Sequence, residues 1–253
     1  MITLASDFGS PYPAAMRAVL VRECQARLID VAHDFPRQDV RTAAFWLREI
    51  LPEFPPAVHL VVVDPGVGTD RAALAVRAGD HALVGPDNGV LVPAARRLAG
   101  DGAIEPFEIA VADPASHTFH GRDVFAPAAA EIHAAGVPRL EGLPSLSRVE
   151  SVVDLSFPEP AVEPDRAAGE VLVVDGFGNA ITNVPGDWLA DSYGDTVEVD
   201  GEPAPARRTY AAVEPGAELV TVGSHGNVEL AANRGRGDEA FGVAPGDPVT
   251  LTR

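Results

Sequence analysis

Three polar side chains stand at points where apolar segments give way to glycine-containing turns. Asp64 directly follows the apolar run 60–63, and Arg71 lies seven residues further on, across the turn DPGVG. His120 belongs to a separate turn and is followed by Gly121. A carboxylate, a guanidinium and an imidazole that converge could hold one water molecule and deprotonate it. We therefore predict a water-activating site composed of Asp64, Arg71 and His120.

The chemistry of these three groups limits their roles. Arg71 stays protonated and cannot be the base, but its charge stabilises a developing hydroxide. Asp64 or His120 would then orient the water or take its proton. A purely structural interpretation stays open at this point, in which Asp64 and Arg71 form a salt bridge that closes the loop and His120 caps the next helix.

The surrounding segments predict a sheet whose strand ends meet. Residues 60–63 and 82–84 are short apolar runs, typical of strands buried on both faces, and each leads into a Gly/Pro turn that carries a carboxylate. Open α/β folds bind ligands at the carboxyl ends of their strands, so we expect the turns at 64–68 and 85–89 to share one crevice. The alternation of other segments indicates a largely parallel α/β sheet, with strands expected at 2–5, 28–32 and 107–111 and helices at 14–25, 39–51, 92–98 and 124–135.

The pattern changes near residue 157, where a Pro/Glu-rich stretch begins. Short strands separated by Gly, Asp and Pro follow it, which suits a small barrel. These strands are expected at 169–174, 180–184, 196–199, 218–222, 228–232 and 248–251. The fold class predicted is α/β: an N-terminal largely parallel α/β domain at 1–158, a linker at 159–167, and a C-terminal β-barrel domain at 168–253.

The charge balance restricts the partners that the protein can have. The net charge is −18, and the basic residues are all arginine. This acidic surface argues against nucleic acid or anionic membranes as partners. It resembles the surface of a protein kept soluble at high salt, so we expect a halophilic source. GC-rich codon usage would also favour arginine over lysine, but it does not explain 37 acidic residues.

Other patterns exclude further classes of protein. No signal-peptide pattern is found, and no apolar run approaches the ~18 residues of a membrane span, so we expect a cytoplasmic protein. Cys24 is the single cysteine, which excludes an internal disulfide and a cysteine-based zinc cluster. There is no P-loop and no GxGxxG after the first strand. A metal site is a competing interpretation, but none of the possible ligands has the spacing of a known zinc motif; these are His33, Asp34, His59, Asp64, Asp87, His117 and His120.

Several polar residues elsewhere allow more than one interpretation. Asp7, at the end of the first strand, could accept hydrogen bonds from a ribose diol or could simply cap a turn. The turn from Asp175 to Asn179 has both donors and acceptors, and it could also be a plain hairpin. Ser224 and Glu229 present the same two possibilities in a later hairpin.

Taken together, the motifs resemble a known family along nearly the whole chain. They are SDFG, HLVVVDPGVGTDR, VGPDNGVL, TFHGRDVFAPAAA, DGFGNAITNV and GSHGNVELAANRG, in that order. The chain is similar to the S-adenosylmethionine hydrolases that form adenosine, the hydrolytic branch of the superfamily that includes the fluorinase and the chlorinase. The resemblance implies hydrolysis of S-adenosyl-L-methionine to adenosine and L-methionine, by attack of an activated water on ribose C5′.

The resemblance also implies an assembly and a set of binding residues. It implies a homotrimer, with each site between the N-terminal domain of one subunit and the barrel of its neighbour, and no metal or organic cofactor. Asp64, Arg71 and His120 would activate the water, and Asp7 would hold the ribose hydroxyls. The methionine and adenine portions would contact Asp175, Asn179, Ser224, Glu229 and the backbone near Ala232.

Two other functions are weighed against hydrolysis. A halogenase, giving 5′-chloro-5′-deoxyadenosine from chloride, would lack Asp64 and His120, and would carry a serine where Gly121 stands. A non-catalytic module that binds adenosine or S-adenosylmethionine would have no need of a water-activating group. The chain departs from the family pattern in its short Ser10-Pro11-Tyr12 segment, at Gln38, where relatives carry an aromatic residue, and at His225, where the fluorinase has an arginine.

Overall fold

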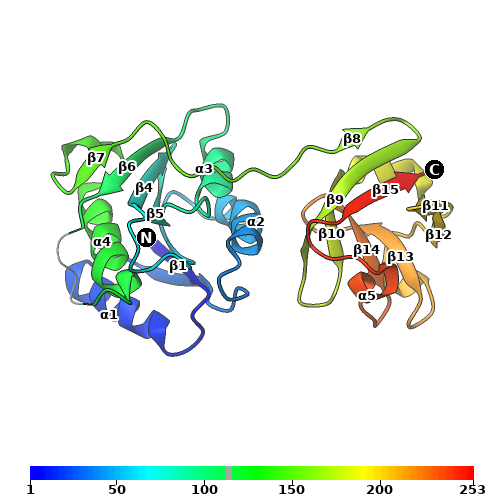
Figure 1. The fold of residues 1–253 in the computed structure, drawn as a ribbon, viewed down its shortest axis with the longest axis horizontal. Coiled ribbons are helices and arrows are strands. Elements are labelled where there is room, and N and C mark those ends of the chain that lie inside the picture. The colour runs from blue at the N-terminus through cyan, green and yellow to red at the C-terminus, as the bar shows by residue number, and fades with distance from the viewer. Residues whose placement is uncertain (112–115) are drawn as a thin grey trace. The chain divides into compact units, whose positions relative to one another are not determined.

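The computed structural model describes residues 1–111 and 116–253 (Figure 1). The chain divides into two compact units, Met1–Ser156 and Phe157–Arg253. Each unit has an apolar core of its own.

The described part of the first unit is built on a seven-stranded sheet with the order β2-β1-β3-β5-β4-β6-β7. Strands β2, β1, β3 and β5 run parallel to one another. Strands β4, β6 and β7 extend the sheet beyond β5, and each pairs antiparallel with its neighbours. The strands are β1 (Ile2–Ser6), β2 (Leu28–Ala32), β3 (Val58–Val62), β4 (Ala73–Ala78), β5 (His81–Pro86), β6 (Glu105–Ile109) and β7 (Leu146–Arg148). The largely parallel α/β sheet is therefore confirmed, and β4 and β7 are additions to the predicted strands.

Strand β4 turns the sheet antiparallel for a local reason. Only Gly79 and Asp80 separate its end from the start of β5, and a two-residue loop can join only antiparallel neighbours. Gly79 supplies the positive φ, +58°, that such a tight turn needs. The hairpin brings Arg71, just before β4, back toward the end of β3.

Helices cover both faces of the sheet (Figure 1). Helix α1 (Tyr12–Glu23) packs beside α4 (Ala126–Ala135), and α2 (Val40–Ile50) packs beside α3 (Val92–Ala99). Asp39, the first residue of the helix predicted at 39–51, caps α2 by accepting a hydrogen bond from the Thr42 N–H at 2.9 Å. A π-helical turn, Gly121–Phe125, precedes α4, and short 3₁₀ turns lie at Leu51–Glu53 and Val137–Gly142.

The second unit is a nearly closed antiparallel barrel, as predicted. Its strand order is β12-β11-β15-β9-β10-β14-β13, with β8 paired to β9. A bridge between Ala206 and Val220 links the two ends of this order. The strands are β8 (Ala161–Val162), β9 (Arg166–Val174), β10 (Ala180–Pro185), β11 (Thr196–Val199), β12 (Glu202–Pro205), β13 (Glu218–Val222), β14 (Asn227–Ala232) and β15 (Pro248–Thr252). Strand β8 and the start of β9 lie inside the stretch predicted as a linker.

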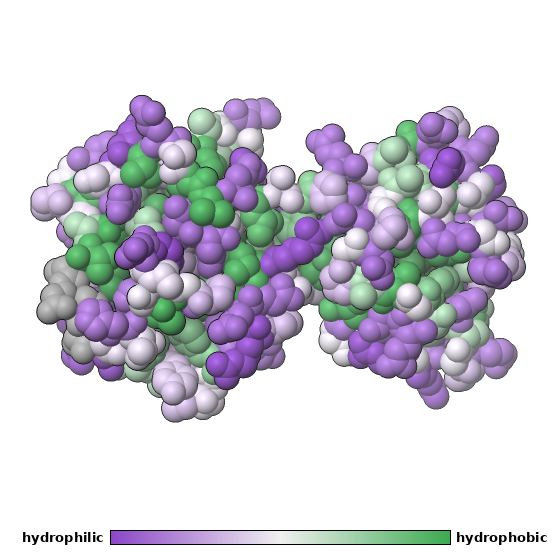
Figure 2. Space-filling model, viewed as in Figure 1, coloured by the Kyte–Doolittle hydropathy of each residue, from purple (hydrophilic) through white to green (hydrophobic). Residues whose placement is uncertain are grey.

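Shorter helical elements complete the second unit. They are the 3₁₀ turns Gly186–Ser192 and Tyr210–Ala212 and the short helix α5 (Gly237–Phe241). On the face shown in Figure 2, polar side chains cover much of each unit, and apolar groups are scattered among them. Among the described residues, no helix combines the length and the apolar character that crossing a membrane requires.

Candidate active site

The structure brings Asp64, Arg71 and His120 into one hydrogen-bonded cluster. Asp64 follows β3 after Val63, Arg71 lies just before β4, and His120 directly precedes the π-helical turn. The Arg71 guanidinium binds Asp64 with two N–H groups: Nε lies 2.8 Å from Oδ1, and Nη2 contacts Oδ2. The same Nη2 lies 2.8 Å from Nδ1 of His120. Arg71 is thus the centre that joins a carboxylate to an imidazole.

Packing holds this arginine in place. Its guanidinium lies over the ring of Phe125 at 5.0 Å from the ring centroid and donates to the Ala72 carbonyl at 3.2 Å. The side chains of Arg71 and Asp64 are 10% and 4% exposed, and His120 is also buried. Because the charges are shielded from water, their mutual attraction is stronger than that of a surface ion pair.

The contact with Arg71 fixes the tautomer of His120. A guanidinium has only donors, so Nδ1 of His120 must be the acceptor of this hydrogen bond. The neutral ring then carries its proton on Nε2. Burial lowers the pKa of His120, and the nearby positive charge of Arg71 lowers it further. The ring is therefore neutral at pH 7 and offers an N–H donor at Nε2.

Glycines in the turn DPGVG let the backbone pass close to its neighbours. Gly68 has a φ of +79°, and a Cβ there would lie 2.9 Å from the His117 carbonyl oxygen. A side chain at this position would push the turn away from the segment that leads to His120. The glycine spacing seen in the sequence thus allows the turn after Asp64 to approach the segment that leads to His120.

Asp64 and His120 line a pocket of about 470 Å³ in the first unit, and Asp7 lines the same pocket. Its apolar wall contains Phe8, Tyr12 and Phe119, whose rings meet edge to face with centroids 5.5 to 6.2 Å apart. A concave site with an apolar wall and a few convergent polar groups is the usual form of a small-molecule site. Asp7, predicted from its place at the end of the first strand, therefore lines the same pocket as Asp64 and His120.

The turn at 85–89 supports the cluster instead of joining the pocket. Oδ1 of Asp87 accepts a hydrogen bond from the Val153 N–H at 2.7 Å, and Asp87 does not line the pocket. The side chain of Asn88 donates to the Val63 carbonyl at 2.9 Å, directly before Asp64. The expectation of one shared crevice is wrong in this respect, because the second turn faces the segment around Val153.

A second polar cluster lies in the barrel unit. Oδ1 of Asp175 accepts from the N–H groups of Phe177 and Asn179 at 2.8 and 2.9 Å, and its Oδ2 accepts from the Asn179 side chain at 3.0 Å. Tyr210 donates its hydroxyl to Oε2 of Glu229 at 2.9 Å and lies 3.5 Å from the Asn179 side-chain nitrogen. Asp175, Asn179 and Glu229 are thus brought together.

Tyr210 was missed by the sequence analysis. It lies in a 3₁₀ turn with no distinctive motif, and only its contact with Glu229 reveals it. Burial raises the pKa of Glu229, and burial also raises the pKa of Tyr210. The cluster therefore offers a carboxyl, an amide and a hydroxyl in partly dry surroundings.

Ser224 and Ala232 lie at the two ends of the same strand pair. Ser224 is exposed in the hairpin between β13 and β14, next to Gly223, which packs directly against the Glu229 carboxyl. Ala232 pairs with Glu218 at the far end of β14, and its carbonyl accepts from the Gly235 N–H at 3.3 Å. The structure places Ser224 near the second cluster and shows no hydrogen bond from Ala232 to it.

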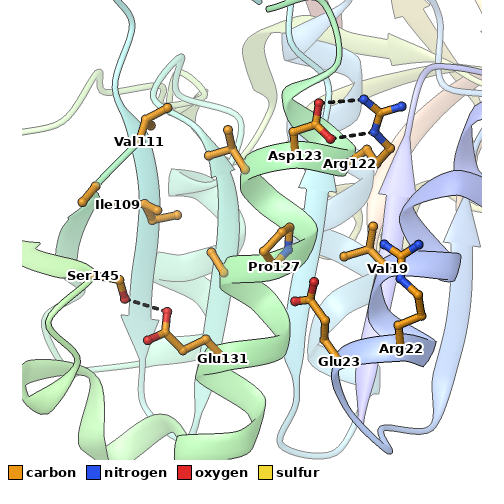
Figure 3. Close-up of a pocket in the computed structure, with 13 residues that line it drawn as sticks. Val19, Arg22, Glu23, Ile109, Val111, Arg122, Asp123, Pro127, Glu131 and Ser145 are labelled. Carbon is orange, nitrogen blue, oxygen red and sulfur yellow. Dashed lines mark hydrogen bonds and ion pairs between the residues drawn. The ribbon is translucent and has the colours of Figure 1, made fainter. Parts of the chain in front are cut away.

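A larger groove of about 530 Å³, shown in Figure 3, runs between α1, α4 and β6. It contains none of the predicted site residues. Four of its polar groups are paired with one another: Arg122 binds Asp123 at 2.6 Å, and Ser145 donates to Glu131 at 2.6 Å. The size of the groove alone therefore does not make it the candidate site.

Among residues 1–111 and 116–253, no group of three or more His, Cys, Asp or Glu side chains is placed to hold a metal ion. His59, one of the candidate ligands, is the second residue of β3, where it hydrogen-bonds Thr3 and His81 at 2.8 and 2.9 Å. Its nitrogens are thus used inside the sheet.

The fold and the two clusters define a two-unit protein, an α/β unit followed by a β-barrel unit, each of which carries one cluster of hydrogen-bonded polar side chains. Residues 2–142 match the N-terminal domain of the SAM hydroxide adenosyltransferases, and residues 169–250 match the C-terminal domain. The chain belongs to the SAM hydroxide adenosyltransferase family, so the family predicted from the motifs is confirmed.

Relatives match along the full length of the chain. An (R)-S-adenosyl-L-methionine hydrolase of Salinispora tropica is 42% identical, over 99% of this chain and 97% of its own. One of Thermus thermophilus is 43% identical, over 97% of each chain. The crystal structure of a conserved protein from Thermotoga maritima matches with a TM-score of 0.84 and 34% identity, over 100% of both chains.

Proposed function

We infer that this protein hydrolyses S-adenosyl-L-methionine to adenosine and L-methionine. The observation that carries the inference is the buried Asp64–Arg71–His120 cluster, of which Asp64 and His120 line one pocket with Asp7, in a chain whose 42–43% identical relatives are hydrolases of this substrate. Family membership alone would not distinguish a hydrolase from a binding module. The cluster supplies the groups that a reaction with water requires.

The reaction needs little covalent chemistry from the protein. Water attacks C5′ of the ribose in line, the bond from C5′ to sulfur breaks, and its electron pair neutralises the sulfonium, so that methionine leaves as a thioether. Holding water and C5′ in near-attack geometry supplies a large part of the acceleration. Surroundings with little water favour the step, because the positive charge on sulfur disappears in it.

The hydrogen bonds of the cluster support a separate role for each of its three residues in activating the water. His120 accepts from Arg71 at Nδ1, so its Nε2–H would donate to the water oxygen and orient it. A carboxylate oxygen of Asp64 would accept the proton that the water loses as the bond to C5′ forms, and would release it to solvent. Arg71 would stabilise the negative charge that develops on the water oxygen, and its hydrogen bonds would hold Asp64 and His120 in position.

The remaining predicted residues would bind the substrate. Asp7 would accept from the ribose hydroxyls, and the second cluster would contact the methionine and adenine portions through Asp175, Asn179, Ser224, Glu229 and the backbone near Ala232. We propose a homotrimer in which the first cluster of one subunit is completed by the second cluster of a neighbour. Residues 1–158 and 168–253 would act as the two domains, joined by 159–167.

We propose that the reaction needs no metal or organic cofactor and takes place in the cytoplasm. Water activation by Asp64 and His120 requires no metal-bound hydroxide. The single cysteine, Cys24, and the acidic, lysine-free composition are compatible with a reducing interior and with high salt.

A direct assay tests the function. The purified protein is incubated with S-adenosylmethionine in high salt with EDTA, with and without chloride, and products are separated by chromatography. We expect equal amounts of adenosine and methionine, independent of chloride and EDTA. A chlorinated nucleoside would place the protein among the halogenases, and binding without any product would leave only a binding module.

Substitution of Arg71 tests the cluster within that assay. Arg71→Ala should lower turnover by ~100-fold or more, because it removes both the charge and the hydrogen bond that sets the His120 tautomer. Arg96→Ala is the matched control, since Arg96 pairs with Asp154 at 2.8 Å on the surface and should leave turnover unchanged. Full turnover in Arg71→Ala would refute the proposed mechanism.

The division of roles predicts an order among three further variants. Gln can donate from a side-chain N–H, so His120→Gln should keep at least ~10-fold more turnover than His120→Ala. Asp64→Asn should lose activity severely, because an amide cannot take the proton. If His120→Gln is as inactive as His120→Ala while Asp64→Asn remains active, the histidine is the base and our assignment is wrong.

A further inference from the structure

Gln38 has a backbone conformation that its residue type does not favour. Its φ is +62°, and the only other described non-glycine residues with positive φ are Asp200 and Arg234. Such a conformation is uncommon for a residue with a Cβ, and glutamine lacks the local hydrogen bonding that helps asparagine and aspartate adopt it. Strained backbone of this kind persists where the surroundings enforce it, and it concentrates at functional sites.

The conformation directs the Gln38 N–H at a carboxylate. This N–H donates to Oδ2 of Asp7 at 2.7 Å, across 31 residues of sequence. The turn around Gln38 is tightly fixed: Asp39 N donates to the Pro36 carbonyl at 3.1 Å, and Val40 N donates to the Gln38 carbonyl at 3.1 Å. Immediately afterwards Asp39 caps α2, so the helix start anchors the turn.

This hydrogen bond determines how Asp7 can meet a ligand. Asp7 is only 9% exposed, yet it lines the pocket with Asp64 and His120, and Gln38 lines it too. A backbone N–H bonded to a carboxylate is a charge-assisted contact, shorter and stronger than a neutral one. With Oδ2 engaged by the backbone, the carboxyl plane is fixed, and Oδ1 is available to accept from a hydroxyl.

The segment that carries Asp7 is tied from the other side as well. The Ser6 hydroxyl lies 2.7 Å from Nδ1 of His33, and the Gly9 N–H donates to the His33 carbonyl at 2.8 Å. These contacts locate the backbone of the turn after β1, and Gln38 then sets the rotation of the Asp7 side chain. Backbone position and side-chain rotation are thus controlled by two different loop residues.

We propose that Gln38 is a positioning residue for ribose recognition, acting through its backbone N–H on Asp7. The proposal rests on the function inferred above, because it takes the hydroxyls of the substrate ribose as the ligand of Asp7. It does not depend on the side chain of Gln38, so an aromatic residue is not required at this position for the carboxylate to be aligned.

The test compares side chains that tolerate a left-handed backbone with one that does not. Gln38→Gly favours the conformation, whereas Gln38→Val opposes it through its β-branched side chain. We expect Gln38→Val to raise KM for S-adenosylmethionine by about tenfold, with kcat changed much less, and Gln38→Gly to raise KM by less than about threefold. Asp200→Val places the same side chain at another left-handed position, φ +52°, and should lower stability without changing KM.

Ligand binding provides a readout that is independent of turnover. Calorimetry would give dissociation constants for adenosine and for 2′,3′-dideoxyadenosine, which lacks both ribose hydroxyls. The ratio of the dissociation constant for 2′,3′-dideoxyadenosine to that for adenosine measures the preference for the ribose hydroxyls. This ratio should fall by about tenfold in Gln38→Val and stay unchanged in Gln38→Gly. In an Asp7→Ala background the ratio should already be low, and Gln38→Val should lower it no further.

These outcomes separate the two proposals. If the wild-type protein binds adenosine and prefers it to the dideoxy compound but gives no product, the hydrolase function fails and the positioning role is still measured. If Gln38→Val keeps the wild-type ratio, or lowers it equally with and without Asp7, the positioning role is overturned. If Asp7→Ala keeps the ratio, Asp7 does not read the hydroxyls and the proposal also falls.

Discussion

At the scale of single residues, the packing around Gly121 bears on whether the pocket could accommodate the serine of a halide site. A Cβ there would lie 2.9 Å from Sδ of Met16, 3.2 Å from Cε2 of Phe119 and 3.3 Å from Cγ1 of Val62. The halogenating relatives were expected to carry a serine here. In this chain the space for that side chain is already filled by the core beneath the pocket.

Gly121→Ser is therefore expected to lower stability without creating a halide site. The added atoms must displace buried neighbours, so the free energy of unfolding should fall by about 1–3 kcal/mol. Denaturant unfolding measures this, and Gly142→Ser is the control, because a Cβ at Gly142 meets nothing within 4 Å. Undiminished stability together with a chlorinated product would show that the pocket accommodates the serine.

At the scale of elements, a side-chain ladder crosses three neighbouring strands of the first unit. Thr3 in β1 lies 2.8 Å from Nδ1 of His59 in β3, and Nε2 of His59 lies 2.9 Å from Nδ1 of His81 in β5. The two imidazole rings are stacked, with centroids 5.2 Å apart. Burial lowers the pKa of His59 to about 3, and the neighbouring His81 contributes in the same direction.

This ladder predicts a loss of stability in acid. The unfolded chain binds a proton at His59 below its ordinary pKa of 6.5, whereas the folded chain does not until about pH 3. Stability from this group is therefore complete above pH 6.5 and is lost progressively as the pH falls toward 3. Melting temperatures across this range should fall less steeply for His59→Gln, which stays neutral. Equal slopes in the two proteins would contradict the assignment.

At the scale of the whole molecule, charge is the dominant feature. The net charge of −18 arises from 37 acidic and 19 basic residues. Many arginines are committed to ion pairs, among them Arg77 with Glu105 at 2.7 Å, and such pairs do not remove the excess of negative charge. Self-repulsion of this excess opposes the compact state, and salt screens it.

Salt is therefore expected to stabilise the protein. Raising NaCl from about 0.1 M to about 1 M shortens the screening length from about 10 Å to about 3 Å, so the melting temperature should rise. KCl at equal ionic strength is the control and should give the same rise, because screening does not depend on the cation. A melting temperature that falls with salt would show that ion pairs outweigh the net repulsion.

Much of the fold was predictable because it depends on local pattern. The apolar run that became β3, the Asp39 cap of α2 and the short strands of the barrel all follow from residue type and spacing. The π-helical turn after His120 was not predictable, since such turns have no residue composition of their own. Asp87 was misplaced for a similar reason, because its partner Val153 lies 66 residues away.

The sequence by itself determined most of the strands and the four longer helices, the glycine turns, the charge and the family of the chain, but not β4, β7, β8 and β12. These are properties of neighbouring residues or of motifs, and they need no knowledge of contacts. Only the tertiary structure decided the His120 tautomer, the hydrogen bond from Gln38 to Asp7 and the hydrogen bond from Tyr210 to Glu229. The residues joined by these three contacts lie 49, 31 and 19 positions apart in the sequence. Hydrogen bonds between distant side chains depend on strand order and rotamer choice, and those are set by the packing of the whole unit.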